Sequence, residues 1–187
     1  MIRRAALVWF LAFCLIPMAC FARDANWAKP VVLDGVPNLN QVAPNLYRSA
    51  QPTAAGFQAL EKSLNIKADL DLRDYHSDAN FLTGTKITPL NVPMNALHIT
   101  TDEIVAALKL IKAKQAEGPI LVHCQHGADR TGVVIAMYRI IYQGWSKAQA
   151  IDEMEHGGFN FHSIFFNIPA FINNADINQI KAALAKA

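Results

Sequence analysis

One ten-residue segment, HCQHGADRTG at positions 123–132, combines a nucleophile with groups that bind anions. Five residues separate Cys124 from Arg130, and Gly127 between them permits backbone conformations that other residues avoid. A loop of this kind before a helix directs successive backbone N–H groups inward and forms an anion-binding nest. These N–H groups and Arg130 favour a thiolate at Cys124, and the guanidinium can hold two phosphoryl oxygens at once. The segment therefore predicts nucleophilic chemistry on a phosphate ester.

The other side chains of this segment are expected to contact the substrate or to support the loop. Thr131 offers a hydroxyl to the thiolate, and His123 fits a buried residue that hydrogen-bonds the loop better than a proton donor. His126 is expected to face the substrate or the solvent. Asp129, an acidic group inside a phosphate loop, is expected to point outward and to pair with a base. The predicted substrate-binding set is Gln125, His126, Gly127, Ala128, Asp129 and Thr131.

The segment must lie where a strand leads into a helix. Residues 119–122 predict a short apolar strand before it, and TGVVIAMYRIIYQ after Arg130 predicts a buried helix that ends at Gly144. Further strands are predicted at 31–33, 66–72 and 86–92, and helices at 53–64, 104–111 behind a start signal at 101–103, 146–154 and, with a break at Pro169, 164–187. Strands that alternate with helices indicate an α/β domain with a mostly parallel central sheet flanked by helices. In such sheets ligands bind beyond the carboxyl ends of the strands.

The composition is that of one folded domain with a sizeable core. The chain has 187 residues, of which 52% are hydrophobic and 17% charged, and this excludes an intrinsically disordered chain. The formal charge of +2 comes from Arg3 and Arg4, so the rest of the chain carries no net charge. We therefore expect no non-specific binding to nucleic acid or to anionic lipid. Cys124 is the single cysteine after residue 22, which leaves no internal disulfide.

Residues 1–22 have the pattern of a secretory signal peptide. Two arginines precede an apolar run that ends in small residues, which predicts cleavage after Ala22. An uncleaved membrane anchor and lipoprotein processing at Cys20 are the alternatives, but Pro17 interrupts the run, which is short for a membrane span. We expect a domain at 23–187 that is periplasmic or secreted and has no membrane contact after cleavage.

The spacing H-C-x5-R-[ST] resembles the signature of the cysteine-dependent protein tyrosine and dual-specificity phosphatases. NLYRSAQP at 45–52, DLR at 71–73 and GWS at 144–146 resemble further motifs of the small dual-specificity branch, especially its bacterial exported members and their plant and fungal atypical relatives. The resemblance covers approximately residues 40–165. The length and position of this loop argue against two other classes of enzyme. Rhodanese-like sulfurtransferases commonly have a shorter loop between cysteine and arginine, and low-molecular-weight phosphatases carry their loop near the N-terminus. The resemblance implies a three-layer phosphatase fold.

The resemblance also implies a two-step mechanism that needs no cofactor. Cys124 attacks the phosphorus, an acid protonates the departing oxygen, and water then hydrolyses the phosphocysteine. Arg48 and Arg73 are expected either to contact substrate or to make structural bonds to loop carbonyls. The histidines show no ligand spacing with carboxylates, so no metal site is expected. The implied partner is a phosphorylated protein or a small phosphoester, and the expected state is a monomer.

The sequence leaves several candidates for the general acid. The family usually supplies an aspartate from the loop before the central helix, but Asn95 and Ala96 stand at the expected positions. Asp102 is the nearest carboxylate and is the candidate acid, although it could instead cap the following helix. The alternatives are His98 in the same loop and Asp74 or Asp78 in the loop that follows the strand predicted at 66–72.

Two other functions compete with a phosphomonoesterase that acts on phosphotyrosine or mixed phosphoprotein substrates. A phosphoinositide or inositol (pyro)phosphate phosphatase is one, although loops that read multiply charged headgroups often carry lysines and residues 125–129 contain none. A catalytically idle phosphate-binding module is the other. The missing carboxylate at Asn95 allows it, whereas the intact Cys124 and Arg130 argue against it.

Overall fold

The computed structural model describes residues 23–186, and the signal peptide predicted at 1–22 lies outside this range. The centre of the fold is a six-stranded sheet in the order β1-β2-β3-β6-β4-β5. Its strands are β1 (Lys29–Pro30), β2 (Asn40–Ala43), β3 (Leu46–Ser49), β4 (Ala68–Asp71), β5 (Thr88–Asn91) and β6 (Ile120–His123). The pairs β3–β6, β6–β4 and β4–β5 are parallel, whereas β1–β2 and β2–β3 are antiparallel. The predicted mostly parallel sheet is thus confirmed.

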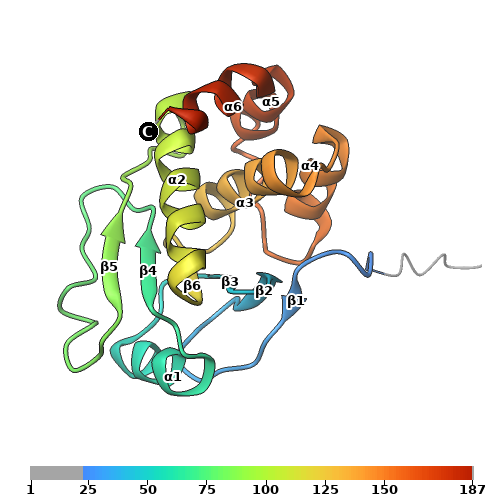
Figure 1. Cartoon of the computed structure of the whole chain (residues 1–187). Helices are drawn as coiled ribbons and strands as arrows, with labels where there is room; N and C mark the ends of the chain where they lie inside the picture. Colours follow the sequence, from blue (N-terminus) through green and yellow to red (C-terminus); the bar gives the residue numbers. More distant parts are fainter. Residues whose placement is uncertain (1–22, 187) are drawn as a thin grey trace, which may run out of the picture.

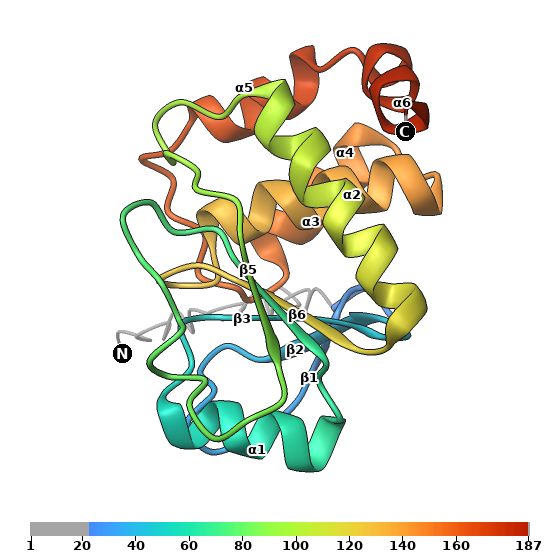
Figure 2. The same ribbon diagram turned by 60° about the vertical axis from the view of Figure 1, so that its left-hand side comes forward.

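Helices cover both faces of this sheet and complete three layers (Figures 1 and 2). Helix α1 lies on one face, and the other five helices lie on the opposite face. The helices are α1 (Ala54–Leu64), α2 (Thr101–Glu117), α3 (Asp129–Gln143), α4 (Lys147–His156), α5 (Asn167–Asn174) and α6 (Ile177–Ala185). This arrangement confirms the expected α/β class with three layers.

The core is divided by the sheet because successive strand side chains point to opposite faces. On β6, Val122 packs with the large cluster under α2 and α3, whereas Leu121 packs with the smaller cluster beneath α1. Phe57 and Leu60 of α1 are fully buried in that smaller cluster. Both faces of β6 are therefore buried, which fixes the strand that leads into the HCQHGADRTG segment.

Capping side chains start the helices mostly where the sequence indicates. The Thr53 hydroxyl accepts a hydrogen bond of 3.0 Å from the Gly56 amide at α1, and Ser146 caps α4 as predicted. At α2 the cap is Thr100, whose side chain and that of Glu103 form a reciprocal capping box. Asp102 is therefore not the cap of this helix, contrary to the structural alternative given above.

Three local predictions are wrong. The first edge strand is Lys29–Pro30 instead of 31–33, and strands β2 and β3 were not predicted. Pro169 does not break the C-terminal helix but lies in the first turn of α5, where a backbone N–H has no partner inside the helix. The break falls instead at Ala175, before Asp176 caps α6. Within residues 23–186, none of the helices has the length and apolarity required to span a bilayer.

Candidate active site

The phosphate loop, defined here as residues 124–130, connects β6 to α3 at the carboxyl edge of the parallel strands. In the register of the sheet, Ser49, His123 and Asp71 end three neighbouring strands side by side. Gly127 takes a φ of +68°, and a Cβ at this position would lie 2.3 Å from the Ser49 carbonyl oxygen. The end of β3 therefore presses directly on the loop, and glycine is required at position 127.

Three successive carbonyl groups of the phosphate loop are hydrogen-bonded from outside. The acceptor–donor pairs are Gln125 O with Gln51 N at 3.2 Å, His126 O with Asn38 Nδ2 at 3.0 Å, and Gly127 O with Arg48 Nη2 at 2.7 Å. A trans peptide points its N–H away from its C=O. The amides that follow these carbonyls therefore point into the loop, as an anion-binding nest requires.

Cys124 lies at the base of this nest and is almost completely buried. Burial alone would raise the pKa of its thiol, but the net shift is downward. Hydrogen bonds from the Thr131 hydroxyl and amide, the charge of Arg130 and the His126 amide together outweigh burial. The buried Thr131 hydroxyl has no oxygen or nitrogen partner among residues 23–186, so its proton is available to the sulfur. The environment thus favours a thiolate.

Arg130 lies in the first turn of α3 and reaches the loop that precedes α2. Ala128 caps α3 without a side-chain hydrogen bond, so the first amides of this helix remain available to an anion. Arg130 Nη1 donates to the Met94 carbonyl oxygen at 3.4 Å. This contact brings the residues that follow Met94 beside the phosphate loop. These residues are Asn95 and Ala96, which occupy the position where the family usually has its acid.

The candidate acids lie in different surroundings. Asp102 and His98 are exposed near the start of α2, and Asp74 is exposed in the loop after β4. Asp78 is buried, accepts a hydrogen bond of 2.6 Å from Gln51 Nε2 and lies 3.0 Å from His123 Nε2. These contacts lower the pKa of Asp78 despite its burial, which makes it a poor proton donor.

His123 is buried between two carboxylates behind the phosphate loop. Its Nε2 lies 3.1 Å from Asp69 Oδ1 and 3.0 Å from Asp78 Oδ2. Burial opposes its charge, but the two carboxylates raise the pKa of His123 well above its usual value. Burial raises the pKa of Asp69 to about 6. The role expected for His123 was a buried support of the loop, and its position agrees with that role.

Arg48 bonds the phosphate loop directly, whereas Arg73 is linked to it through Gln51. The Arg48 guanidinium is buried, stacks on the Phe159 ring at 3.7 Å and bonds the Gly127 carbonyl. Burial lowers the pKa of Arg48 to about 10, so it remains charged at neutral pH. Arg73 bonds the Gln51 side chain at 2.7 Å, and Gln51 in turn bonds the loop through its backbone amide.

The base that pairs with Asp129 is His162, which the sequence did not identify. Both carboxylate oxygens of Asp129 lie within 3.1 Å of His162 Nδ1, and the His162 amide donates to Oδ1 at 3.0 Å. Residues 33 positions apart give no spacing pattern that could reveal this pair. His123 and His162 therefore both have carboxylate partners in the fold, although the spacing of histidines and carboxylates along the chain gave no sign of them.

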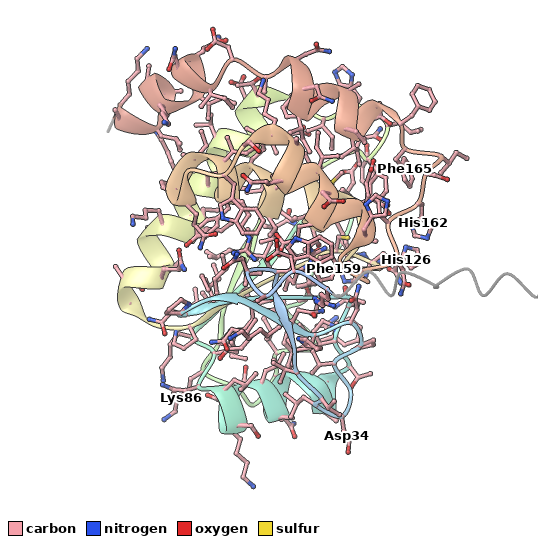
Figure 3. The ribbon with its side chains drawn as sticks, turned by 90° about the vertical axis from the view of Figure 1, so that its right-hand side faces the viewer. Asp34, Lys86, His126, Phe159, His162 and Phe165 are labelled. Atoms are coloured by element: carbon pink, nitrogen blue, oxygen red, sulfur yellow. The ribbon has the colours of Figure 1, made fainter. Side chains whose placement is uncertain are left out.

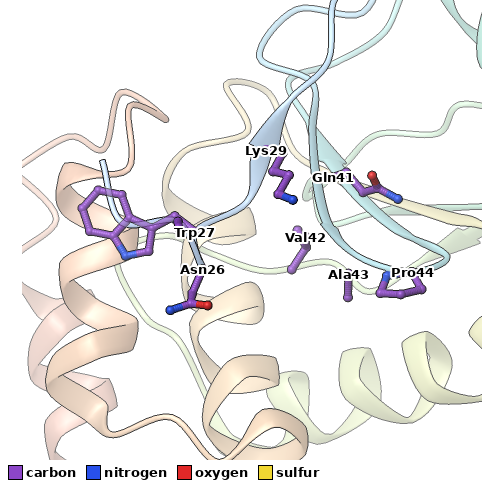
Figure 4. A pocket seen from close by; sticks show the side chains of 8 residues that line it. Asn26, Trp27, Lys29, Gln41, Val42, Ala43 and Pro44 are labelled. Carbon is purple, nitrogen blue, oxygen red and sulfur yellow. The ribbon is translucent and has the colours of Figure 1, made fainter. Parts of the chain in front are cut away.

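A pocket of about 370 Å³ lies at the other end of the sheet (Figure 4). Trp27, Lys29, Gln41 and Pro44 are among its lining residues. Ala43 at its edge pairs with Leu46, which begins β3, whereas the phosphate loop follows the opposite strand ends. This pocket is therefore separate from the candidate active site.

Comparison with known proteins identifies similar sequences and folds. The sequence model of the tyrosine phosphatase family matches residues 36–187. The chain is 36% identical over 164 residues to the dual specificity protein phosphatase TpbA of Pseudomonas aeruginosa, covering 87% of this chain and 73% of TpbA. A crystal structure of a cysteine-to-serine TpbA variant in complex with phosphotyrosine has a TM-score of 0.79 at 34% identity and covers 89% of this chain and all of that one.

A yeast protein is also similar. The chain is 31% identical over 157 residues to the inositol diphosphatase SIW14 of Saccharomyces cerevisiae, covering 80% of this chain and 54% of SIW14. The crystal structure of the SIW14 catalytic core has a TM-score of 0.70 at 31% identity and covers 80% of this chain and 91% of that one.

Proposed function

Because this chain belongs to the tyrosine phosphatase family, we propose that it hydrolyses phosphotyrosine and related phosphomonoesters through a phosphocysteine on Cys124. The observation that carries this proposal is the set of inward amides around a thiol whose pKa is lowered. A buried thiolate inside a ring of N–H donors is suited to attack an electrophilic phosphorus. The same donors stabilise the equatorial oxygens of the transition state.

The reaction has two displacements at phosphorus. The Cys124 sulfur forms a bond to phosphorus while the ester P–O bond breaks, and an acid delivers a proton to the leaving oxygen. Water then attacks the phosphocysteine, the P–S bond breaks, and inorganic phosphate leaves. Arg130 holds two phosphoryl oxygens during both steps. We propose Asp102 as the acid for two reasons. It is the first carboxylate in the sequence after Met94, whose carbonyl contacts Arg130, and Asp78 is already engaged with His123.

The substrate class follows from the surface of the phosphate loop. Gln125 and His126 are exposed, and residues 125–129 contain no lysine to match a multiply charged headgroup. This favours an aryl phosphomonoester, and the phosphotyrosine complex of the similar TpbA variant supports the same choice. An inositol diphosphate is the second candidate substrate because of the similarity to SIW14. The predicted leader further suggests that the enzyme acts outside the cytoplasm.

A substrate panel tests the proposal. Phosphotyrosine peptide, phosphoserine peptide, an inositol phosphate and an inositol diphosphate are each assayed by phosphate release with wild type and Cys124→Ser. We expect turnover to be fastest on phosphotyrosine and to be absent in Cys124→Ser, which should still bind phosphate. Turnover by Cys124→Ser near the wild-type rate would contradict the mechanism, and preference for the diphosphate would contradict the substrate class.

A further inference from the structure

Two imidazoles and one carboxylate meet on the rim of the phosphate loop. One ligand atom each from His126, Asp129 and His162 can be chosen so that all three lie within 4.8 Å of one another. The His126 and His162 rings meet edge to face with centroids 5.2 Å apart. Figure 3 shows both side chains on the same side of the molecule, near Phe165. Three donors of the type that Zn²⁺ prefers thus converge here.

The separations suit a tetrahedral ion after small adjustments. Zn²⁺ binds imidazole nitrogen and carboxylate oxygen at about 2.0–2.2 Å, which places the ligand atoms about 3.3 Å apart. Asp129 and His162 are already 2.9 Å apart, and His126 is exposed and has no side-chain hydrogen bond within residues 23–186 that must be broken. Asp129 is buried and held by the His162 amide, so one ligand is fixed before the ion arrives.

We propose that His126, Asp129 and His162 form a zinc site whose occupation inhibits the enzyme. His126 and Asp129 belong to the phosphate loop, whereas His162 belongs to the segment between α4 and α5. An ion shared by all three would tie that segment to the loop. It would also place a solvent ligand beside the exposed side chain of His126, where the substrate must approach. The inhibitory effect rests on the proposed function, whereas zinc binding itself does not.

Zinc binding is measured first, without turnover. In the Cys124→Ser protein, which lacks the thiolate as a competing ligand, competition against a chromophoric chelator should show one Zn²⁺ per chain. His162→Gln and His126→Gln should each weaken this binding at least about tenfold. Because His126 makes no side-chain hydrogen bond, its variant tests the site even if His162→Gln folds poorly. His156→Gln is the matched control, since His156 also pairs with an aspartate, at 2.8 Å, but outside the cluster.

Inhibition is then measured on an aryl phosphate with proteins that retain Cys124. Micromolar zinc should inhibit wild type and His156→Gln alike, and His162→Gln should need at least about tenfold more zinc for the same inhibition. Magnesium, which prefers oxygen ligands, should not inhibit. Absence of zinc binding by Cys124→Ser, equal binding by all variants, or binding without inhibition would each overturn the proposal. None of these outcomes depends on whether phosphotyrosine is the substrate.

Discussion

The Arg48 guanidinium donates a hydrogen bond of 2.7 Å to the carbonyl oxygen of Gly127 from inside the protein. This bond fixes one of the outward carbonyls whose amide neighbours point into the phosphate loop. Because Arg48 also stacks on Phe159, the strand end, the loop and the segment after α4 are joined at one buried side chain. The geometry of the anion nest therefore depends on a residue that is itself buried.

Arg48→Met should damage both stability and catalysis. The variant leaves the buried Gly127 carbonyl without its donor, and we expect unfolding to require about 2–4 kcal/mol less free energy. The ratio kcat/KM on an aryl phosphate should also fall, because the loop loses an outer support. Urea unfolding and steady-state kinetics measure the two effects. Arg73→Met is the control. It loses the side-chain contacts of Arg73 with Gln51 and His76, neither of which is a carbonyl of the phosphate loop, so it should change both quantities less.

Thr131→Val should move the acid limb of the activity profile to higher pH. The Thr131 hydroxyl lowers the pKa of Cys124, so its loss leaves less thiolate at neutral pH. We expect kcat/KM at neutral pH to fall about tenfold, the scale of one charge-assisted hydrogen bond. The pH dependence of iodoacetamide inactivation reports the same pKa independently of turnover. Thr88→Val on the exposed strand β5 serves as control, and an unchanged profile in Thr131→Val would exclude this role for the hydroxyl.

Asp69→Asn should change how stability depends on pH. Burial raises the pKa of Asp69 to about 6 in the folded protein, above its value of 3.8 when unperturbed, so the folded state binds this proton more tightly. The tighter proton binding by Asp69 stabilises the folded state most below pH 4, and this stabilisation is lost as the pH rises through 6. Asp69→Asn removes this stabilisation, so the difference in unfolding free energy between variant and wild type should change by about 2–3 kcal/mol between pH 4 and pH 7. Urea titrations across this range would refute the assignment if the two proteins followed parallel curves.

Asp102→Asn should affect poor leaving groups more than good ones. An alkyl alcohol leaves only when protonated, whereas a nitrophenol leaves readily without a proton. If Asp102 donates that proton, kcat on an alkyl phosphate should fall about a hundredfold and kcat on nitrophenyl phosphate much less. Asp34→Asn, an exposed carboxylate outside both candidate loops, is the control, and Asp74→Asn tests the alternative acid in the same assay. Equal loss on both substrates, or no loss, would remove Asp102 as the acid.

The part of the fold that sequence predicted well is the part with a strong local signal. The apolar run before His123 and the buried helix after Arg130 are periodic and long enough to be read directly, and they locate the loop between them. The short strands β2 and β3 carry few apolar residues in a region rich in proline and asparagine. They form a local hairpin, but this hairpin joins the sheet only through the pairing of β3 with β6, which is remote in sequence. Pro169 was misread because its effect depends on its position within a turn.

The same distinction applies to the candidate site. The spacing from Cys124 to Arg130 is a local property and identifies the phosphate loop. The supports of that loop are not local, since Asn38 and Phe159 approach it only through the folded sheet and the segment after α4. The pairing of Asp129 was expected, but its partner His162 was not, because no fixed spacing links them.

The outer bonds of the loop have a consequence for folding. The bonds from Asn38 to His126 and from Arg48 to Gly127 join residues 88 and 79 positions apart. Contacts at such separations can form only when the chain has closed long loops, which has an entropic cost. The nest therefore belongs to the folded chain alone, and we expect Cys124 to have the reactivity of an ordinary thiol until these outer bonds have formed.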